Sequence, residues 1–204
     1  NRYMNFEFAE QINRHLEKLD FEKAISFGEA ELKKIPFTDF HPIIGSTLTP
    51  QVGSLVTWID NFYKTISKKI EIKALYFEMN EFDINTDTWY IDGFAYKQDG
   101  GIDLDDMEWL CDVTRETMTP TEFVLTGFEK LQQSFADIIE QVENDELSDD
   151  LQNARDWAEQ IVIARFMELM RLGHLKAKQQ DLHWAKIPIY FTEHSYDFIV
   201  KSEN

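Results

Sequence analysis

"IKALYFEMNEFDINTDTWYIDGFAYK", residues 72–97, is the stretch that decides the fold. It contains two runs rich in aromatic and branched residues, IKALYFEMNEF (72–82) and WYIDGFAYK (89–97), which are separated by DINTDT (83–88). Aromatic and branched residues favour strands, whereas Asp, Asn and Thr favour turns. The pattern therefore predicts a β-hairpin over residues 71–97. Apolar residues fall on both faces of its first strand, which is typical of a sheet with helices packed on one side.

Three helices are predicted before this hairpin. Residues 5–19 place apolar side chains at helical spacing, which predicts the first helix. Asp20 has the right side chain to cap a second helix. Thr49 and Pro50 combine a hydroxyl cap with a proline at the first helical position, so a third helix is expected to start there.

Further elements are predicted after the hairpin. FVLTG (123–127) is interpreted as a short strand, and an apolar stripe at helical spacing predicts a helix from Gly127. Ser148 can cap a long helix over about 149–172, which is apolar nearly all round after Ile161 and is therefore expected to be buried. KIPIYFT and YDFIV, on either side of EHS, predict a closing β-hairpin.

The order of these elements predicts the fold class. Three helices are followed by a hairpin, a short strand, two helices and a second hairpin, so strands and helices do not alternate and the class is α+β. We expect a mainly antiparallel sheet of four or five strands that packs against the N-terminal and C-terminal helices. The charge shift near residue 73 coincides with no flexible linker, so residues 1–204 are expected to form a single domain.

The negative charge of the chain is concentrated in one segment. The net charge is −18, and residues 74–159 alone carry 23 acidic and four basic side chains, a net charge of −19. A segment this negative repels phosphate backbones and anionic lipids, so we expect neither a nucleic-acid nor a membrane partner. We expect these charges to converge on one patch after folding. Such a patch attracts cations, and a basic protein is the expected partner.

The sequence shows no pattern of a membrane or secreted protein. No run approaches the apolar length of about 18 residues that a membrane-spanning helix needs. The first residues lack a basic stretch followed by an apolar one, so no signal peptide is expected. Cys111 is the single cysteine, which excludes an internal disulfide. These observations together predict a reducing, cytoplasmic location.

GGIDLDDMEWLCD (100–112) forms an acidic loop after the predicted hairpin. The candidate site residues are four of its carboxylates, Asp103, Asp105, Asp106 and Glu108, together with Asp99 directly before it. Clustered carboxylates can bind hard cations such as Ca²⁺, which makes Asp103, Asp105 and Asp106 candidate metal ligands, although the spacing of an EF-hand is absent. The alternatives are a solvated loop, in which Asp103 or Asp105 caps a short helix, and a protein-contact surface.

No sequence motif assigns a catalytic centre. There is no HExxH, no zinc spacing of Cys and His, no P-loop and no GxSxG, so no catalytic residue and no cofactor is assigned. Acidic neighbours raise the pKa of a thiol, and Cys111 is expected to be buried and inert.

Asp92 lies within an apolar strand and shares a face with Tyr90 and Phe94. Its carboxylate is hydrogen-bonded, paired or facing solvent, or it acts as an acid with a raised pKa.

Three hypotheses for the function follow from these features. The first is an acidic binding module, in its sharpest form an immunity protein that neutralises a basic nuclease toxin. Its expected binding surface combines exposed aromatic rings with the acidic loop: Trp89, Tyr90, Tyr96, Trp109, Asp99, Asp103, Asp105, Asp106 and Glu108. The second is a metal-assisted hydrolase that uses Asp92, Asp103, Asp105 and Asp106. The third is a structural homo-oligomer such as a homodimer. The lack of catalytic motifs favours binding over catalysis.

Overall fold

The computed structural model describes residues 6–36, 39–196 and 198–203. Residue 5, where the sequence predicts the first helix to begin, and Asp197 in the predicted closing hairpin lie outside these ranges. Before the sheet, the described chain forms α1 (Phe6–Glu17), α2 (Phe21–Lys33) and α3 (Val52–Ile66), as expected. Asp20 caps α2 by accepting a hydrogen bond from the backbone N–H of Lys23 (3.2 Å). Thr49–Gln51 forms a short 3-10 turn that leads directly into α3. The predicted cap by the Thr49 hydroxyl is wrong, because Thr49 lies inside this turn and α3 begins after Gln51 without a side-chain cap.

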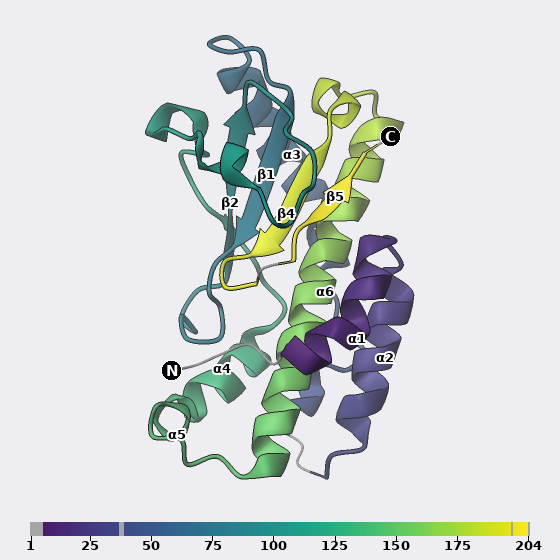
Figure 1. Ribbon diagram of the computed structural model, residues 1–204, viewed down its shortest axis with the longest axis vertical. Coiled ribbons are helices and arrows are strands. Elements are labelled where there is room, and N and C mark those ends of the chain that lie inside the picture. Colours follow the sequence, from purple (N-terminus) through teal and green to yellow (C-terminus); the bar gives the residue numbers. More distant parts are fainter. Residues whose placement is uncertain (1–5, 37–38, 197, 204) are drawn as a thin grey trace.

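The strands of the described chain form one mixed sheet in the order β3-β2-β1-β4-β5 (Figure 1). They are β1 (Ala74–Met79), β2 (Tyr90–Tyr96), β3 (Phe123–Val124), β4 (Ile189–Glu193) and β5 (Val200–Ser202). The pairings β1–β2, β2–β3 and β4–β5 are antiparallel, but β1 and β4 are parallel. The predicted α+β class is confirmed, and the sheet is mixed rather than purely antiparallel.

The parallel pairing follows from the connection between the two hairpins. After β3 the chain passes through α4 (Glu129–Asp137), α5 (Ile139–Glu143) and α6 (Asp149–Gln179) before it enters β4. A long crossover of this kind allows β4 to run in the same direction as β1, whereas a tight turn joins two strands that run in opposite directions. Hydrophobic periodicity identifies a strand but not its neighbour, so the sequence alone does not reveal this pairing.

Helix α6 runs along almost the full length of the molecule (Figure 1). Ser148 caps it by accepting a hydrogen bond from the backbone N–H of Leu151 (3.3 Å). It continues to Gln179, beyond the predicted end near residue 172, because His174 and Ala177 are still buried in the fold. Its middle is buried on all sides, since it contacts α1, α2, α3 and the sheet. Among the described residues, no helix combines the length and the apolar character needed to cross a membrane.

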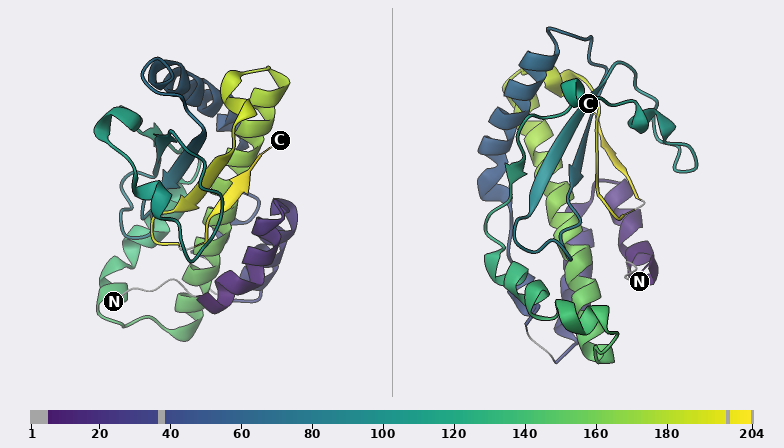
Figure 2. Two further views of the ribbon diagram at one scale, coloured as in Figure 1. Left: turned by 45° about the horizontal axis from the view of Figure 1, so that its top comes forward. Right: turned by 90° about the vertical axis from the view of Figure 1, so that its left-hand side faces the viewer.

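One face of the sheet packs on helices. Leu75, Phe77 and Met79 of β1 belong to the main hydrophobic core, which also contains the buried side chains of α3 and α6. The right-hand view of Figure 2 shows α3 and α6 on this side of the sheet. Alternation along β1 therefore directs its even-numbered side chains to the opposite face.

The opposite face has a different and incomplete cover. Tyr76, Tyr96 and Tyr190 form a small separate cluster there, and the segment 97–118 packs Trp109 and its neighbours on them. This segment lies on the side of the sheet away from α3 and α6 (Figure 2). The part of the face around Glu78 and Asp92 is only half-buried. That open part of the sheet is where the charged side chains described below meet.

Candidate functional site

Three carboxylates of the open sheet face, Glu78, Asp92 and Glu122, are called the acidic face here. Glu78 on β1 and Asp92 on β2 are directly opposite each other in the antiparallel register. Glu122 immediately precedes β3, which pairs with β2 through Tyr90 and Val124. Like charges directly opposite in a sheet are destabilising, so this arrangement works against the stability of the free protein.

The electrostatics of Asp92 reflect this crowding. Its pKa is raised, first by burial and then by the charges of Glu122 and Glu78. The pKa of Tyr90 is raised in the same way, by burial and by Glu122, Asp92 and Glu78. No lysine or arginine of the described chain forms an ion pair with Asp92 or Glu122. Among the described residues, the charges of Asp92 and Glu122 are therefore not balanced by an ion pair.

Glu78 is held in place by two hydrogen bonds. Its Oε2 accepts one from the Tyr76 hydroxyl (2.5 Å), and its Oε1 lies 2.7 Å from Nδ1 of His194. The hydrogen bond and the charge of Glu78 raise the pKa of His194, whose side chain is largely exposed. His194 lies in the turn after β4, so the two hairpins meet at this point.

Glu78, Asp92 and His194 line a shallow cleft of about 310 Å³. Its walls come from the two hairpins: Glu78, Asn80, Glu81, Asn85, Tyr90, Asp92 and His194. Asn80 also fixes the backbone beside the cleft, because its Oδ1 accepts a hydrogen bond from the N–H of Tyr90 (3.0 Å). The cleft is polar and negatively charged, which suits a cationic group rather than an anion.

The acidic loop that follows β2 is fastened to the sheet by Trp109. The indole ring packs edge-on against Tyr96 and Tyr190, with ring centroids 5.0 and 5.1 Å apart. Its Nε1–H donates a hydrogen bond to the carbonyl oxygen of Gly101 (3.1 Å). The Tyr190 hydroxyl donates to Oδ1 of Asp99 (2.5 Å). Asp99 before the loop and Trp109 near its end thus both attach it to the sheet.

Both glycines of the loop are required by this geometry. A side chain on Gly100 would collide with the indole ring, since a β-carbon there would lie 2.2 Å from Cδ1 of Trp109. Gly101 has a φ of +71°, a conformation that other residues rarely adopt. The Gly-Gly pair therefore allows Trp109 to reach the sheet and the chain to turn over it.

The predicted metal ligands are not brought together as a coordination site. Oδ1 of Asp103 accepts a hydrogen bond from the N–H of Asp105 (3.1 Å), and Oδ1 of Asp106 accepts one from the N–H of Glu108 (3.3 Å). Within residues 6–36, 39–196 and 198–203, no group of three or more His, Cys, Asp or Glu side chains is placed to hold a metal ion. The carboxylates of the loop stabilise local turns and remain exposed.

Two of the aromatic residues predicted to be exposed lie in the interior. Trp89 is 1% exposed, packs edge-on against Phe82 with ring centroids 5.0 Å apart, and donates from Nε1 to the carbonyl oxygen of Phe82 (2.9 Å). Tyr96 is 2% exposed beneath the acidic loop and donates to the carbonyl oxygen of Leu110 (2.9 Å). Both predictions are wrong, because polar atoms of aromatic rings find buried partners here. Tyr90 and Trp109 are half-buried.

The expectation of one converged acidic patch is also wrong. The stretch 140–150, around α5 and the start of α6, lies at the opposite end of the molecule from the acidic loop (Figure 1). Asp83, Asp156 and Glu159 of the same acidic segment are buried. The charges therefore divide into a sheet-face group, a helix-end group and an interior group.

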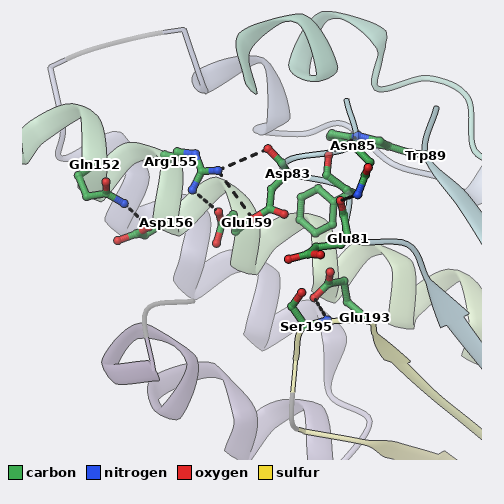
Figure 3. Close-up of polar contacts among 11 residues, drawn as sticks. Glu81, Asp83, Asn85, Trp89, Gln152, Arg155, Asp156, Glu159, Glu193 and Ser195 are labelled. Atoms are coloured by element: carbon green, nitrogen blue, oxygen red, sulfur yellow. Dashed lines mark hydrogen bonds and ion pairs between the residues drawn. The ribbon is translucent and has the colours of Figure 1, made fainter. Parts of the chain in front are cut away.

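Sequence reasoning missed the interior group, which joins α6 to the β1–β2 connection. Nη1 of Arg155 lies 2.6 Å from Oε1 of Glu159, and Nη2 lies 3.8 Å from Oδ2 of Asp83 (Figure 3). All three side chains are buried. The four-residue spacing of Arg155 and Glu159 on an apolar helix is the only sequence signal of it. Buried ion pairs rarely add net stability, but removal of one partner is strongly destabilising.

The sequence also gave no indication of Glu78, Glu122 or His194 as neighbours of Asp92. Their proximity depends on strand register and on the parallel pairing of β1 with β4, which no local pattern reveals. The alternation that places Asp92 on one face with Tyr90 and Phe94 is confirmed by the register. Cys111, expected to be buried, is exposed at the end of a short 3-10 turn, so that prediction is wrong.

Comparison of the chain with models of known protein families, with curated proteins and with solved structures finds no match.

Proposed function

We propose that this protein is a binding module that docks a basic protein on the acidic face and the adjoining acidic loop. One observation carries the proposal: Glu78 and Asp92 face each other across β1 and β2, with Glu122 close enough to raise the pKa of Asp92. This repulsion lowers the stability of the free protein and has no evident role unless a cationic partner binds. A lysine or arginine side chain of a partner would relieve it by placing positive charge between the carboxylates.

The docking hypothesis gives the acidic loop a role as well. Its exposed carboxylates extend the negative surface beyond the sheet, and long-range attraction of this kind accelerates encounter with a basic partner. An inhibitor of the immunity type, which occupies the basic nucleic-acid-binding surface of a toxin, is the most specific form of this proposal. Small acidic α+β proteins without catalytic motifs are typical of that class.

The structure favours docking over the two alternative hypotheses. A metal-assisted hydrolase needs converging ligands, and the carboxylates of Asp103, Asp105 and Asp106 are instead engaged in or exposed beside local turns. A homo-oligomer of two acidic faces would bring like charges together. A homodimer through another surface is a separate prediction, which light scattering at several protein concentrations tests.

Affinity capture followed by binding kinetics tests the proposal. Tagged wild-type protein is incubated with extract of its source cells at low salt, in parallel with D92N/E122Q and with the control E143Q/D145N. The control removes the same charge from exposed positions at the far end of the molecule. We expect the wild type and the control to retain a basic protein that D92N/E122Q loses.

The purified partner is then studied by surface plasmon resonance. Its association rate constant should fall steeply between about 0.05 M and about 0.5 M NaCl, because the screening length shortens from about 14 Å to about 4 Å. D92N/E122Q should reduce the rate constant and its salt dependence. A partner that binds at the same rate at both salt concentrations, or that binds D92N/E122Q as well as the control, would refute the proposal.

A further inference from the structure

The tip of the acidic loop presents apolar side chains to solvent. Among the described residues the exposed large aliphatic side chains are Ile84 (45% exposed), Ile102 (44%), Leu104 (49%) and Val124 (48%). Two of these four lie two residues apart at the loop tip, where they alternate with aspartates. The right-hand view of Figure 2 shows this segment projecting away from the sheet. Exposed apolar side chains that are rimmed by polar residues mark interaction sites when they lie together, and Ile102 and Leu104 lie together beside aspartates.

The backbone of the tip is held in a defined shape. The N–H of Asp106 donates to the carbonyl oxygen of Asp103 (2.9 Å), and the N–H of Asp103 points at the sulfur of Met107 (3.4 Å). The base is fastened by Trp109, as described above. A contact segment whose conformation is fixed before binding loses less entropy on association than a flexible one.

We propose that the loop tip, residues 101–106, inserts into the partner, with Ile102 and Leu104 as its apolar anchors. This inference rests on the proposed function and names the chemistry of the partner: an apolar pocket with lysine or arginine side chains on its rim. The pocket takes the two aliphatic side chains, and the rim faces the exposed carboxylates of Asp103, Asp105 and Asp106. An apolar centre surrounded by charged groups is the usual arrangement of an interface that binds tightly.

The anchors and the acidic face contribute to different steps of binding. Long-range charge attraction acts mainly on association, whereas buried apolar contacts at the centre of an interface act mainly on dissociation. Loss of two buried aliphatic side chains should weaken the affinity by roughly 10- to 100-fold or more, nearly all of it as faster dissociation. Ile84 has the same exposure but lies outside the loop, so it provides a matched control.

The test measures dissociation of the partner retained by the wild type from I102S/L104S and from I84S. Both variants change exposed side chains, and circular dichroism and the melting temperature verify that they fold. We expect I102S/L104S to raise the dissociation rate constant at least about tenfold with the salt dependence of association unchanged, and I84S to change it less than about twofold. Protection of residues 101–106 from hydrogen exchange in the complex is the second expected result.

The outcomes separate the inference from the proposed function. Unchanged dissociation of I102S/L104S, or an equal effect of I84S, overturns the inference and leaves docking on the acidic face standing. Loss of binding by I102S/L104S together with normal salt-dependent binding of D92N/E122Q overturns the proposed function instead. A wild-type protein that retains no basic protein overturns both. Self-association of the wild type that disappears in I102S/L104S assigns the tip to a second copy of this chain and also overturns the inference.

Discussion

Neutralisation of Asp92 should make the free protein more stable. In D92N the amide keeps the shape of the side chain but removes the charge that faces Glu78 across the strand pair and lies near Glu122. Most substitutions at half-buried strand positions destabilise a protein, so a gain is an unusual outcome. It follows here from the raised pKa of Asp92, because a carboxyl group that is harder to ionise in the folded state makes the folded state less stable once it is ionised.

The size of the gain can be worked from the geometry. Side chains directly opposite in an antiparallel pair have β-carbons about 5 Å apart. Two unit charges at about that distance repel each other by ~0.8 kcal/mol in water, and physiological salt screens roughly half of this repulsion. Glu122 adds a second repulsion of the same sign. We therefore expect D92N to raise the free energy of unfolding by about 0.5–1 kcal/mol and the melting temperature by about 1–4 °C.

Thermal and urea denaturation of wild type, D92N and the control D87N provide the assay. Asp87 is exposed, and no described residue forms an ion pair with it, so D87N makes the same chemical change without the facing carboxylate. The advantage of D92N over D87N should shrink when NaCl rises from about 0.05 M to about 0.5 M, and should vanish near about pH 3, where both states are protonated. Equal effects of D92N and D87N, or a lower stability of D92N, would refute the reasoning.

Three further predictions concern Trp109 and His194 at the site and the buried His174 of α6. W109A should lower the free energy of unfolding by about 1–2 kcal/mol, which is less than the loss expected for a fully buried indole. It should also speed hydrogen exchange in the acidic loop, and unchanged exchange would show that other contacts hold the loop. Burial lowers the pKa of His174 to about 4, below the ordinary unfolded value of about 6.5, so the wild type should lose up to about 3 kcal/mol of stability as pH falls from about 6.5 to about 4. Denaturation curves of H174Q should lack that part of the pH dependence, and an identical slope in the two proteins would contradict the assignment. The pKa of His194, measured by NMR, should lie above its ordinary value and return towards it in E78Q; its contribution to stability is present at low pH and is lost as pH rises through the folded-state pKa.

Local sequence patterns were sufficient for most elements of the fold. Capping by Asp20 and Ser148, and the contrast between helical and alternating periodicity, predict α1, α2, α3, α6 and both hairpins in the right order. The single helix predicted from Gly127 is wrong in its extent, because the described chain divides it at Ile138 into α4 and α5 and begins it at Glu129. Local patterns also do not predict that β1 and β4 are parallel neighbours. The residues that pair between these two strands, such as Leu75 and Ile189, are more than a hundred positions apart in the sequence, so no local pattern reveals the pairing.

The candidate site was predicted only in part. The alternation of β2 places Asp92 on the right face, but its neighbours come from β1, from the segment before β3 and from the turn after β4. The prediction that Trp89 and Tyr96 are exposed relied on the charged residues near them in the sequence. It is wrong because the polar atom of each side chain donates a hydrogen bond to a backbone carbonyl oxygen inside the protein. Register and burial, rather than composition, decide which charges meet.

The pKa of Asp92 in the free protein and in the complex tests the central claim most directly. The claim is that the acidic face is strained by its own negative charge until a partner supplies cations. ¹³C NMR titration of the side-chain carboxyl carbon, assigned with D92N, measures this value in both states. We expect a pKa above the ordinary value of about 3.9 in the free protein and a clear decrease when the basic partner is bound. A pKa that is ordinary in the free protein, or that does not fall on binding, would contradict the account.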